Sequence, residues 1–252
     1  MRGRHSRNGA LTAIKTRKRF HAQDESCGVR NVADITFHSM ADSAYLWTAM
    51  LVADEKGVSY DVAQLVYRSP EHLKLHPFGK MPVMQHGENF IYESLAITHY
   101  IDRAFAGPAL QPSDALGQAD MLRWISIVNA YVFPIMNRFT KERLVRPAWG
   151  FEPDIAFIES AKEPLALQIG LIEDSVTRHR FLVGNTLTLA DCFLLPHLLF
   201  FRQTKEGEAL LANAPATRDW LSRMNSRPSF ETSPMRAFSF FRYQEPPSTR
   251  VT

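Results

Sequence analysis

The chain has 252 residues, of which 45% are hydrophobic and 22% charged, which is enough for one large core or two modest ones. No apolar run approaches the roughly 20 residues that span a bilayer, because the most apolar stretch, 192–201, is short and contains Pro196 and His197, so we expect no transmembrane helix. Cys27 and Cys192 are too few for a disulfide framework or a cysteine-rich metal site, which favours a reducing compartment, with the cytoplasm as the default, and no bound metal.

The net charge of +3 originates in the first 33 residues. This leader holds eight Lys or Arg against two acidic residues, whereas residues 34–252 hold 21 basic against 24 acidic residues. The body of the chain therefore gives no compositional reason to expect a nucleic-acid partner. Residues 1–33 lack the apolar region of a secretory signal, and we expect a disordered basic leader, although its Arg-rich, acid-poor composition also resembles an organellar transit peptide.

Residues 34–107 show a strand, helix, strand order followed by two strands and a helix. Ala44–Lys56 has apolar residues at helical spacing, and Gly57 follows it in the position that favours a left-handed cap. A strand around Ile35 precedes this helix, and another lies within 58–66. The other elements expected in this half are a short irregular helix or loop at 70–76, a hairpin of strands 83–86 and 90–92, and a helix at 94–105.

The second half of the chain has a helical pattern up to about residue 226. It follows the linker-like pairs Gly107-Pro108 and Gln111-Pro112, and its longest periodic segment, 155–176, contains Pro164, which should kink or restart that helix. We therefore expect an α/β domain at 34–107, an all-helical domain at 113–230 and a C-terminal tail at 231–252.

One motif connects these elements to a ligand. The segment His76-Pro77-Phe78-Gly79-Lys80-Met81-Pro82-Val83 is followed about ten residues later by Glu93-Ser94 at the start of a helix. This combination resembles the glutathione site of the cytosolic glutathione transferases, and the likeness extends over most of 35–230. The resemblance implies a thioredoxin-like N-terminal domain, an all-α C-terminal domain, glutathione as co-substrate, and a homodimer packed through the 94–105 helix and the long helix that follows it.

Four residues of the motif are expected to bind the body of glutathione. The resemblance implies a cis Met81-Pro82 bond, which would turn the Met81 backbone outward to pair with a peptide ligand as an added strand does. Ser94 begins a helix, where free N–H groups favour a carboxylate, and Glu93 could bind the adjacent ammonium. A γ-glutamyl group carries both charges; the alternative is a simple helix cap beside a solvated acid.

Two basic residues are candidates for the other carboxylate of glutathione. In related transferases, basic groups before the second helix and before the cis proline have this role, which here fall to Arg68 and Lys80. Tyr67 stands where some family members carry histidine, so Arg68 is the less secure of the two. His72 and His76 look like turn or packing residues, with no pattern that indicates a metal site.

Activation of the thiol requires a hydrogen-bond donor, because a free thiol is mostly protonated at neutral pH. Ser43 precedes the first helix in a segment that resembles the Ser-Pro-Phe segment of the serine-type, bacterial transferases, and it would donate its hydroxyl to the thiolate. Ala44 departs from the usual proline, and Ser39 and Tyr45 are nearby hydroxyls that could substitute. The absence of cysteine from 38–47 disfavours disulfide chemistry at this site.

One further segment of the second half resembles the family, and the resemblance also implies where a second substrate would lie. Leu187–Cys192 resembles the capping box and hydrophobic staple of a buried helix, with Thr188 and Asp191 as the reciprocal pair. A second substrate is expected between the domains, beside a loop over the cleft at 143–149. Its candidate contacts lie on one long helix and are Tyr131, Phe133, Met136 and Arg138.

The sequence thus predicts a glutathione S-transferase that conjugates the glutathione thiolate to a small hydrophobic electrophile. A glutathione-dependent isomerase, dehalogenase or etherase would use the same thiolate. A non-catalytic binding or scaffold protein of the same fold is a third hypothesis, because fold does not fix function.

Overall fold

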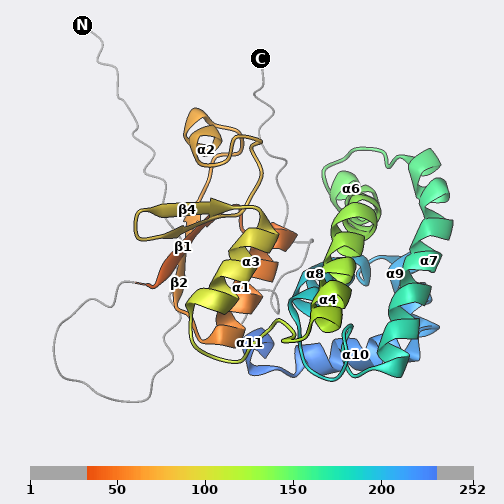
Figure 1. The fold of residues 1–252 in the computed structure, drawn as a ribbon. Coiled ribbons are helices and arrows are strands. Elements are labelled where there is room, and N and C mark those ends of the chain that lie inside the picture. The colour runs from red at the N-terminus through yellow and green to blue at the C-terminus, as the bar shows by residue number, and fades with distance from the viewer. Residues whose placement is uncertain (1–32, 232–252) are drawn as a thin grey trace, which may run out of the picture.

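The computed structural model describes residues 33–231, so Cys27 and nearly all of the expected leader and tail lie outside the described residues. The described chain forms a sheet with helices, followed by a group of helices packed beside it (Figure 1). This is the expected combination of a thioredoxin-like α/β domain with an all-α domain. No helix among residues 33–231 has the length and apolar character that crossing a membrane requires.

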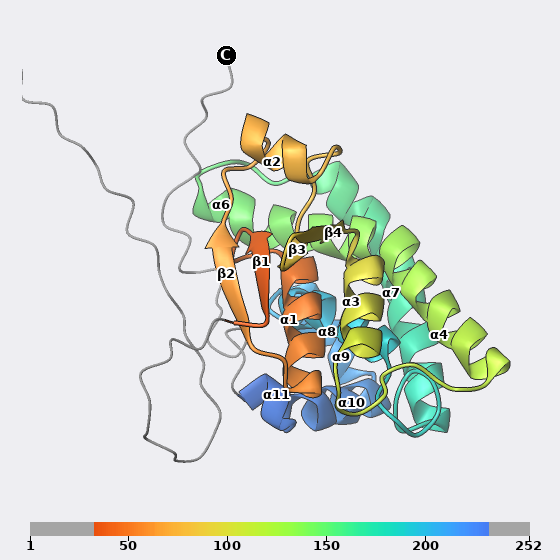
Figure 2. The same cartoon turned by 60° about the vertical axis from the view of Figure 1, so that its left-hand side comes forward.

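The first domain contains a four-stranded sheet in the order β2-β1-β3-β4. β1 and β2 are parallel, and β3 runs antiparallel to both β1 and β4. The strands are β1 Ile35–Ser39, β2 Tyr60–Gln64, β3 Val83–His86 and β4 Asn89–Tyr92, and the helices are α1 Ala44–Lys56, α2 Pro70–Leu75 and α3 Ser94–Ala104. α1 and α3 pack together, whereas α2 stands apart beyond the end of the sheet (Figure 2).

The ends of α1 follow from its sequence. The Ser43 side chain accepts a hydrogen bond from the Leu46 N–H at the N-terminus, and Gly57 ends the helix in the left-handed conformation, with φ 69°. Both ends agree with the predicted helix. α1 is buried on most sides, and it packs against α3 and against helix α8, Leu189–Phe201.

The second domain begins with one long, continuous helical segment. It consists of α4 Ala115–Ile127, the π-helical η1 Val128–Asn137, α5 Arg138–Thr140, the π-helical η2 Lys141–Val145 and α6 Arg146–Ala148. The prediction of a loop at 143–149 is therefore wrong for residues 143–148, which are helical. The connection to the next helix spans only 149–154.

The remaining helices pack mainly against one another and against η1. They are α7 Ile155–Arg178, α9 Lys205–Ala212, α10 Pro215–Asn225 and α11 Pro228–Glu231. α7 continues through Pro164, so it does not restart there. The predicted capping box of α8 is present, and Asp191 also accepts hydrogen bonds from the Leu182 N–H and the Trp220 Nε1, both at 2.9 Å. Cys192 lies fully buried behind it.

One polar cluster joins the two domains. Glu55, near the end of α1, accepts a bidentate pair from Arg227 at 2.5 and 2.7 Å, and a third hydrogen bond from the Ser229 hydroxyl at 2.5 Å. Since Ser229 belongs to α11 and Arg227 immediately precedes that helix, the C-terminal end of the second domain is fastened to the first.

Candidate functional site

The strand directions gather the predicted ligand-binding segments at one end of the sheet. β1, β2 and β4 end there and β3 begins there, because His38 pairs with Val83 and Val83 with Tyr92. The segments that leave this end carry Ser43 after β1, Arg68 after β2, Lys80, Met81 and Pro82 before β3, and Glu93 and Ser94 after β4. Residues from positions 43 to 94 of the sequence therefore meet in one region.

Ser43 is half-buried at the N-terminus of α1. Its oxygen accepts from the Leu46 N–H at 3.3 Å, which leaves the hydroxyl hydrogen free to be donated elsewhere. The helix N-terminus adds a favourable potential for an anion at the same place.

The two alternative hydroxyls already have acceptors within the protein. Ser39 is fully buried, and its hydroxyl donates to the Met40 carbonyl at 3.1 Å. The Tyr45 hydroxyl donates to the Asn129 Oδ1 at 2.9 Å. Burial, followed by the nearby charge of Glu93, raises the pKa of Tyr45 above its ordinary value. Tyr45 is therefore a neutral donor that is held by the second domain.

The Met81-Pro82 peptide is cis, as the resemblance to the transferases implies. Met81 is tied to the loop after β1, because the Met40 N–H points at the Met81 sulfur at 3.4 Å. Among residues 33–231, no hydrogen bond to the backbone N–H or C=O of Met81 is present. The main chain at this point can accept an added extended segment.

Glu93 and Ser94 form an uncapped helix start. Glu93 has a φ of 72°, rare for a residue with a side chain, and no described side chain caps α3, so the N–H groups of its first turn are available. The Glu93 carboxylate is largely exposed and lies 3.7 Å from the Nε2 of the buried His76. Burial lowers the pKa of His76 even though the Glu93 charge opposes this, so the neutral imidazole is favoured.

Arg68 and Lys80 are exposed and flank α2 and the loop that follows it. The N–H of Arg68 donates to the His72 Nδ1 at 3.0 Å, and the His72 Nε2 lies 2.8 Å from the Lys80 carbonyl. The link through His72 escaped the sequence analysis, which took this residue for a packing residue. No local pattern marks it, because the link joins two loops through one buried ring.

The four expected second-substrate residues do not come together. Phe133 packs against Tyr45, with ring centroids 4.9 Å apart, and against the buried His197 of α8 at 5.5 Å. Met136 is fully buried in the core. Tyr131 is 63% exposed, and as it lies two positions before Phe133 it does not share the same helix face.

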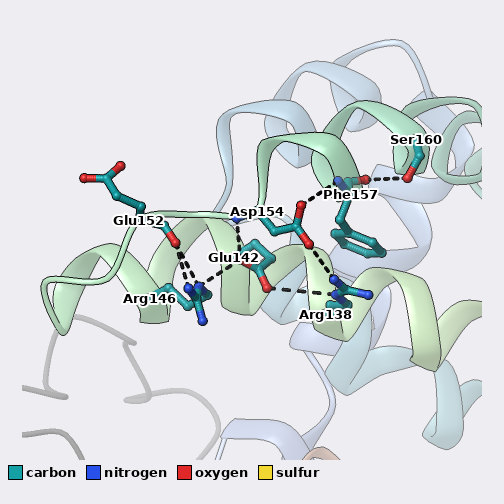
Figure 3. A network of polar contacts seen from close by, with 7 residues as sticks. All are labelled: Arg138, Glu142, Arg146, Glu152, Asp154, Phe157 and Ser160. Atoms are coloured by element: carbon teal, nitrogen blue, oxygen red, sulfur yellow. Dashed lines mark hydrogen bonds and ion pairs between the residues drawn. The ribbon is translucent and has the colours of Figure 1, made fainter.

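Arg138 belongs to a separate polar network (Figure 3). Its guanidinium contacts Asp154 at 2.7 Å and Glu142 at 3.9 Å, and it stacks over the Phe157 ring at 3.9 Å. The largely buried Glu142 also accepts from Arg146 at 3.1 Å and from the Asp154 N–H at 2.8 Å. This network fastens the 149–154 connection to the long helical segment.

No group of three or more potential metal-ligating side chains occurs among the described residues. The polar groups at the sheet end instead comprise a carboxylate, two basic side chains, free backbone groups, a helix N-terminus and a hydroxyl. Such a set suits a ligand with several charges and a peptide-like backbone.

Comparison with known proteins gives the family of this chain. Residues 33–103 match the model of the glutathione S-transferase N-terminal domain, and residues 124–228 match that of the C-terminal domain. The chain is 29% identical over 209 residues to glutathione S-transferase 3 of Zea mays, a match that covers 79% of this chain and 93% of the relative.

Solved structures agree. The apo form of glutathione S-transferase III superposes with a TM-score of 0.73 at 27% identity, covering 81% of this chain and 96% of that one. Glutathione S-transferase-I bound with lactoylglutathione superposes with a TM-score of 0.72 at 25% identity, over 79% of this chain and 97% of that one. Similar curated proteins come from the plants Zea mays, Arabidopsis thaliana and Oryza sativa, and the comparisons do not support the bacterial, serine-type subgroup that the segment at Ser43 suggested. With both family models matched in order along the described residues, the chain belongs to the glutathione S-transferase family.

Proposed function

We propose that the protein is a glutathione S-transferase that joins the glutathione thiolate to a small hydrophobic electrophile. The observation that carries this proposal is the convergence of the predicted ligand-binding segments at one end of the sheet. A relative of the same fold has been solved with lactoylglutathione bound, which supports glutathione as the ligand.

Each end of glutathione has a matching group in this arrangement. The N-terminus of α3 at Ser94 receives the γ-glutamyl carboxylate, and Glu93 binds the ammonium beside it. The Met81 main chain, next to Pro82, pairs with the cysteinyl peptide unit. Arg68 and Lys80 bind the glycyl carboxylate, as charge-assisted donors.

Ser43 stabilises the thiolate without becoming covalently attached. Its oxygen remains a helix cap, and its hydrogen is donated to the glutathione sulfur, so the anionic form is favoured and the thiol proton passes to solvent. The sulfur then forms a bond to the electrophilic carbon, and the displaced group leaves with the electron pair of the broken bond.

For the electrophile, we propose a site that begins at the Tyr45–Phe133 contact between the domains. Phe133 offers an aromatic face beside Tyr45, two positions after Ser43. Tyr131 contributes to this site only from a neighbouring face of the helix. Met136 is buried and Arg138 is held in ion pairs, so both support the site without contacting the electrophile.

We also propose that the protein is a cytoplasmic homodimer. Apolar side chains remain exposed on β4 and α4, namely Phe90 and Tyr92 with Leu122, which favours a partner surface there. Figure 1 shows α3 and α4 on the near side of the molecule.

The low cysteine count supports a reducing compartment, which cell fractionation would test.

Glutathione binding is tested by Glu93→Gln. The change keeps the side-chain volume and removes the charge that faces the ligand's ammonium, so we expect affinity for glutathione to fall about 10- to 100-fold. Isothermal titration with glutathione and turnover with a panel of haloarenes, haloalkanes and aryl ethers measure the effect and separate conjugation from the related thiolate reactions.

The matched control is Glu88→Gln, which removes an exposed carboxylate from the β3–β4 turn. Its affinity should equal that of the unmodified protein. Equal affinities for all three proteins would contradict the proposed site, and a protein that binds glutathione without turning over any electrophile would be a binding protein.

A further inference from the structure

His72 lies at a junction between two loops. It is the third residue of α2 and is fully buried, and its own N–H donates to the Ser69 hydroxyl at 3.2 Å. Its ring spans the space between the residue before α2 and the loop that leads to β3. Both ring nitrogens have a backbone partner, the Arg68 N–H at 3.0 Å and the Lys80 carbonyl at 2.8 Å.

These partners fix the form of the imidazole. A backbone N–H can only donate, so Nδ1 must accept, and a carbonyl can only accept, so Nε2 must carry the proton. Only the neutral ring with its proton on Nε2 satisfies both bonds. A phenyl or aliphatic side chain could fill the same space but would make neither bond.

The bond to Arg68 supports an unusual backbone. Arg68 has a φ of 56°, a left-handed conformation that residues with a side chain rarely adopt. Such conformations persist where the surroundings determine them, and they gather at binding sites. Here the His72 ring accepts a hydrogen bond from the N–H of Arg68, the residue in the left-handed conformation.

The two basic side chains are brought to the same loop. A Cβ atom added to Gly79 would lie 3.2 Å from the Arg68 Cγ, so the stem of Arg68 crosses the backbone immediately before Lys80. The Lys80 carbonyl is meanwhile drawn toward His72, on the buried side. Arg68 and Lys80 therefore belong to a single surface, and the buried His72 ring fixes the backbone of both residues.

We propose that His72 is a positioning residue that places Arg68 and Lys80 as a pair for the glycyl carboxylate of glutathione. This inference rests on the proposed function. The His72 ring does not contact the ligand; it fixes the backbone on both sides of the pair, so that two flexible cations are presented at a set separation. Preorganisation of this kind raises affinity for a ligand with a carboxylate at that end.

The experiment compares glutathione with its glycyl monoethyl ester, which keeps the peptide and removes the charge. For the unmodified protein we expect KM to be about 10-fold higher for the ester. In the His72→Phe variant, KM for glutathione should rise about 5- to 10-fold, the ester-to-glutathione ratio should approach one, and kcat should change less than about 2-fold.

A second variant gives the effect of one bond. His72→Gln keeps a donor near the Nε2 position and loses the acceptor for Arg68, so its ratio should lie between those of the unmodified protein and His72→Phe. In a Lys80→Ala, Arg68→Ala background, His72→Phe should leave the ratio unchanged. Thermal unfolding checks that each variant is folded, and His72→Gln carries the test if His72→Phe does not fold.

The outcomes separate the two proposals. A glutathione-binding protein whose ester-to-glutathione ratio is the same with and without His72 overturns this inference alone. A rise of both KM values by the same factor also overturns it, because that result describes general loosening of the fold. An unmodified protein that does not bind glutathione overturns the proposed function and this inference with it.

Discussion

The hydroxyl of Ser43 can do two things at once. Its oxygen accepts the Leu46 N–H and so completes the first turn of α1, and this leaves its hydrogen for another acceptor. A cap and a thiolate donor are therefore compatible at this position. Ser39 and Tyr45 already donate to protein oxygens, which makes Ser43 the hydroxyl of the three whose hydrogen has no described acceptor.

We expect Ser43→Ala to reduce turnover about 10- to 100-fold, because one hydrogen bond to a charged sulfur is lost. Losing that bond also raises the pKa of the bound thiol, so the pH profile of kcat/KM should move to higher pH. Ultraviolet absorbance of the thiolate in the bound complex, followed across pH, measures the shift directly.

Asp114→Ala is the matched control for this experiment. Asp114 caps α4 by accepting the Gly117 N–H at 2.8 Å, so its loss removes the cap of a helix in the second domain. Both variants should lose about 1 kcal/mol of stability, and only Ser43→Ala should alter the thiol. Full turnover in Ser43→Ala would assign activation to another group.

Among the elements, α1 and α3 are joined by a buried ion pair that also fixes the linker to the second domain. Lys56 and Asp102 lie 3.2 Å apart, and the Lys56 ammonium also donates to the Pro108 carbonyl at 3.0 Å. Asp102 accepts the Leu110 N–H at 2.9 Å. Gly107 passes so close that an added Cβ would lie 3.0 Å from the Lys56 carbonyl oxygen, and its φ of 114° requires glycine.

Removing one partner should therefore destabilise the protein strongly. We expect Lys56→Met to cost about 3–5 kcal/mol in the free energy of unfolding, because Asp102 is left as a buried unpaired charge. Urea unfolding followed by circular dichroism measures this. Lys162→Met breaks the exposed Lys162–Glu159 pair and should cost less than about 1 kcal/mol, so similar losses in the two variants would refute the argument.

The sequence predicts elements well where the signals are local. The limits of α1 follow from Ser43 and Gly57, and the hairpin of β3 and β4 agrees with its turn at Gly87 to within a residue. The ligand-binding segments were also recognisable, because they follow strand ends whose order fixes where they meet.

The sequence fails where the helix pitch changes or where contacts cross between loops. η1 and η2 are π-helical, with wider turns than the 3.6-residue period assumed for the pattern, so the side of the helix on which Tyr131, Met136 and Arg138 lie could not be read from their spacing. His72 joins the residue before α2 to the loop after it through the buried interior, and no rule based on residue spacing predicts such a contact.

At the scale of the whole molecule, the dimer proposal predicts a mass near twice 28.7 kDa by light scattering. A charge placed in an apolar interface disfavours association, so Leu122→Glu should shift the mass toward that of one chain. Leu167→Glu changes an exposed leucine of α7, a helix on the far side of the second domain from the sheet, and should leave the mass unchanged (Figure 1). A single-chain mass for the unmodified protein would refute the dimer.

The cluster around Glu55 limits how the two domains can move. Separating them as rigid bodies would break three hydrogen bonds to a carboxylate that is 6% exposed, and it would expose the contact between α1 and α8 to water. We therefore expect the two domains to keep their relative position around the last turn of α1 when a ligand binds at the sheet end.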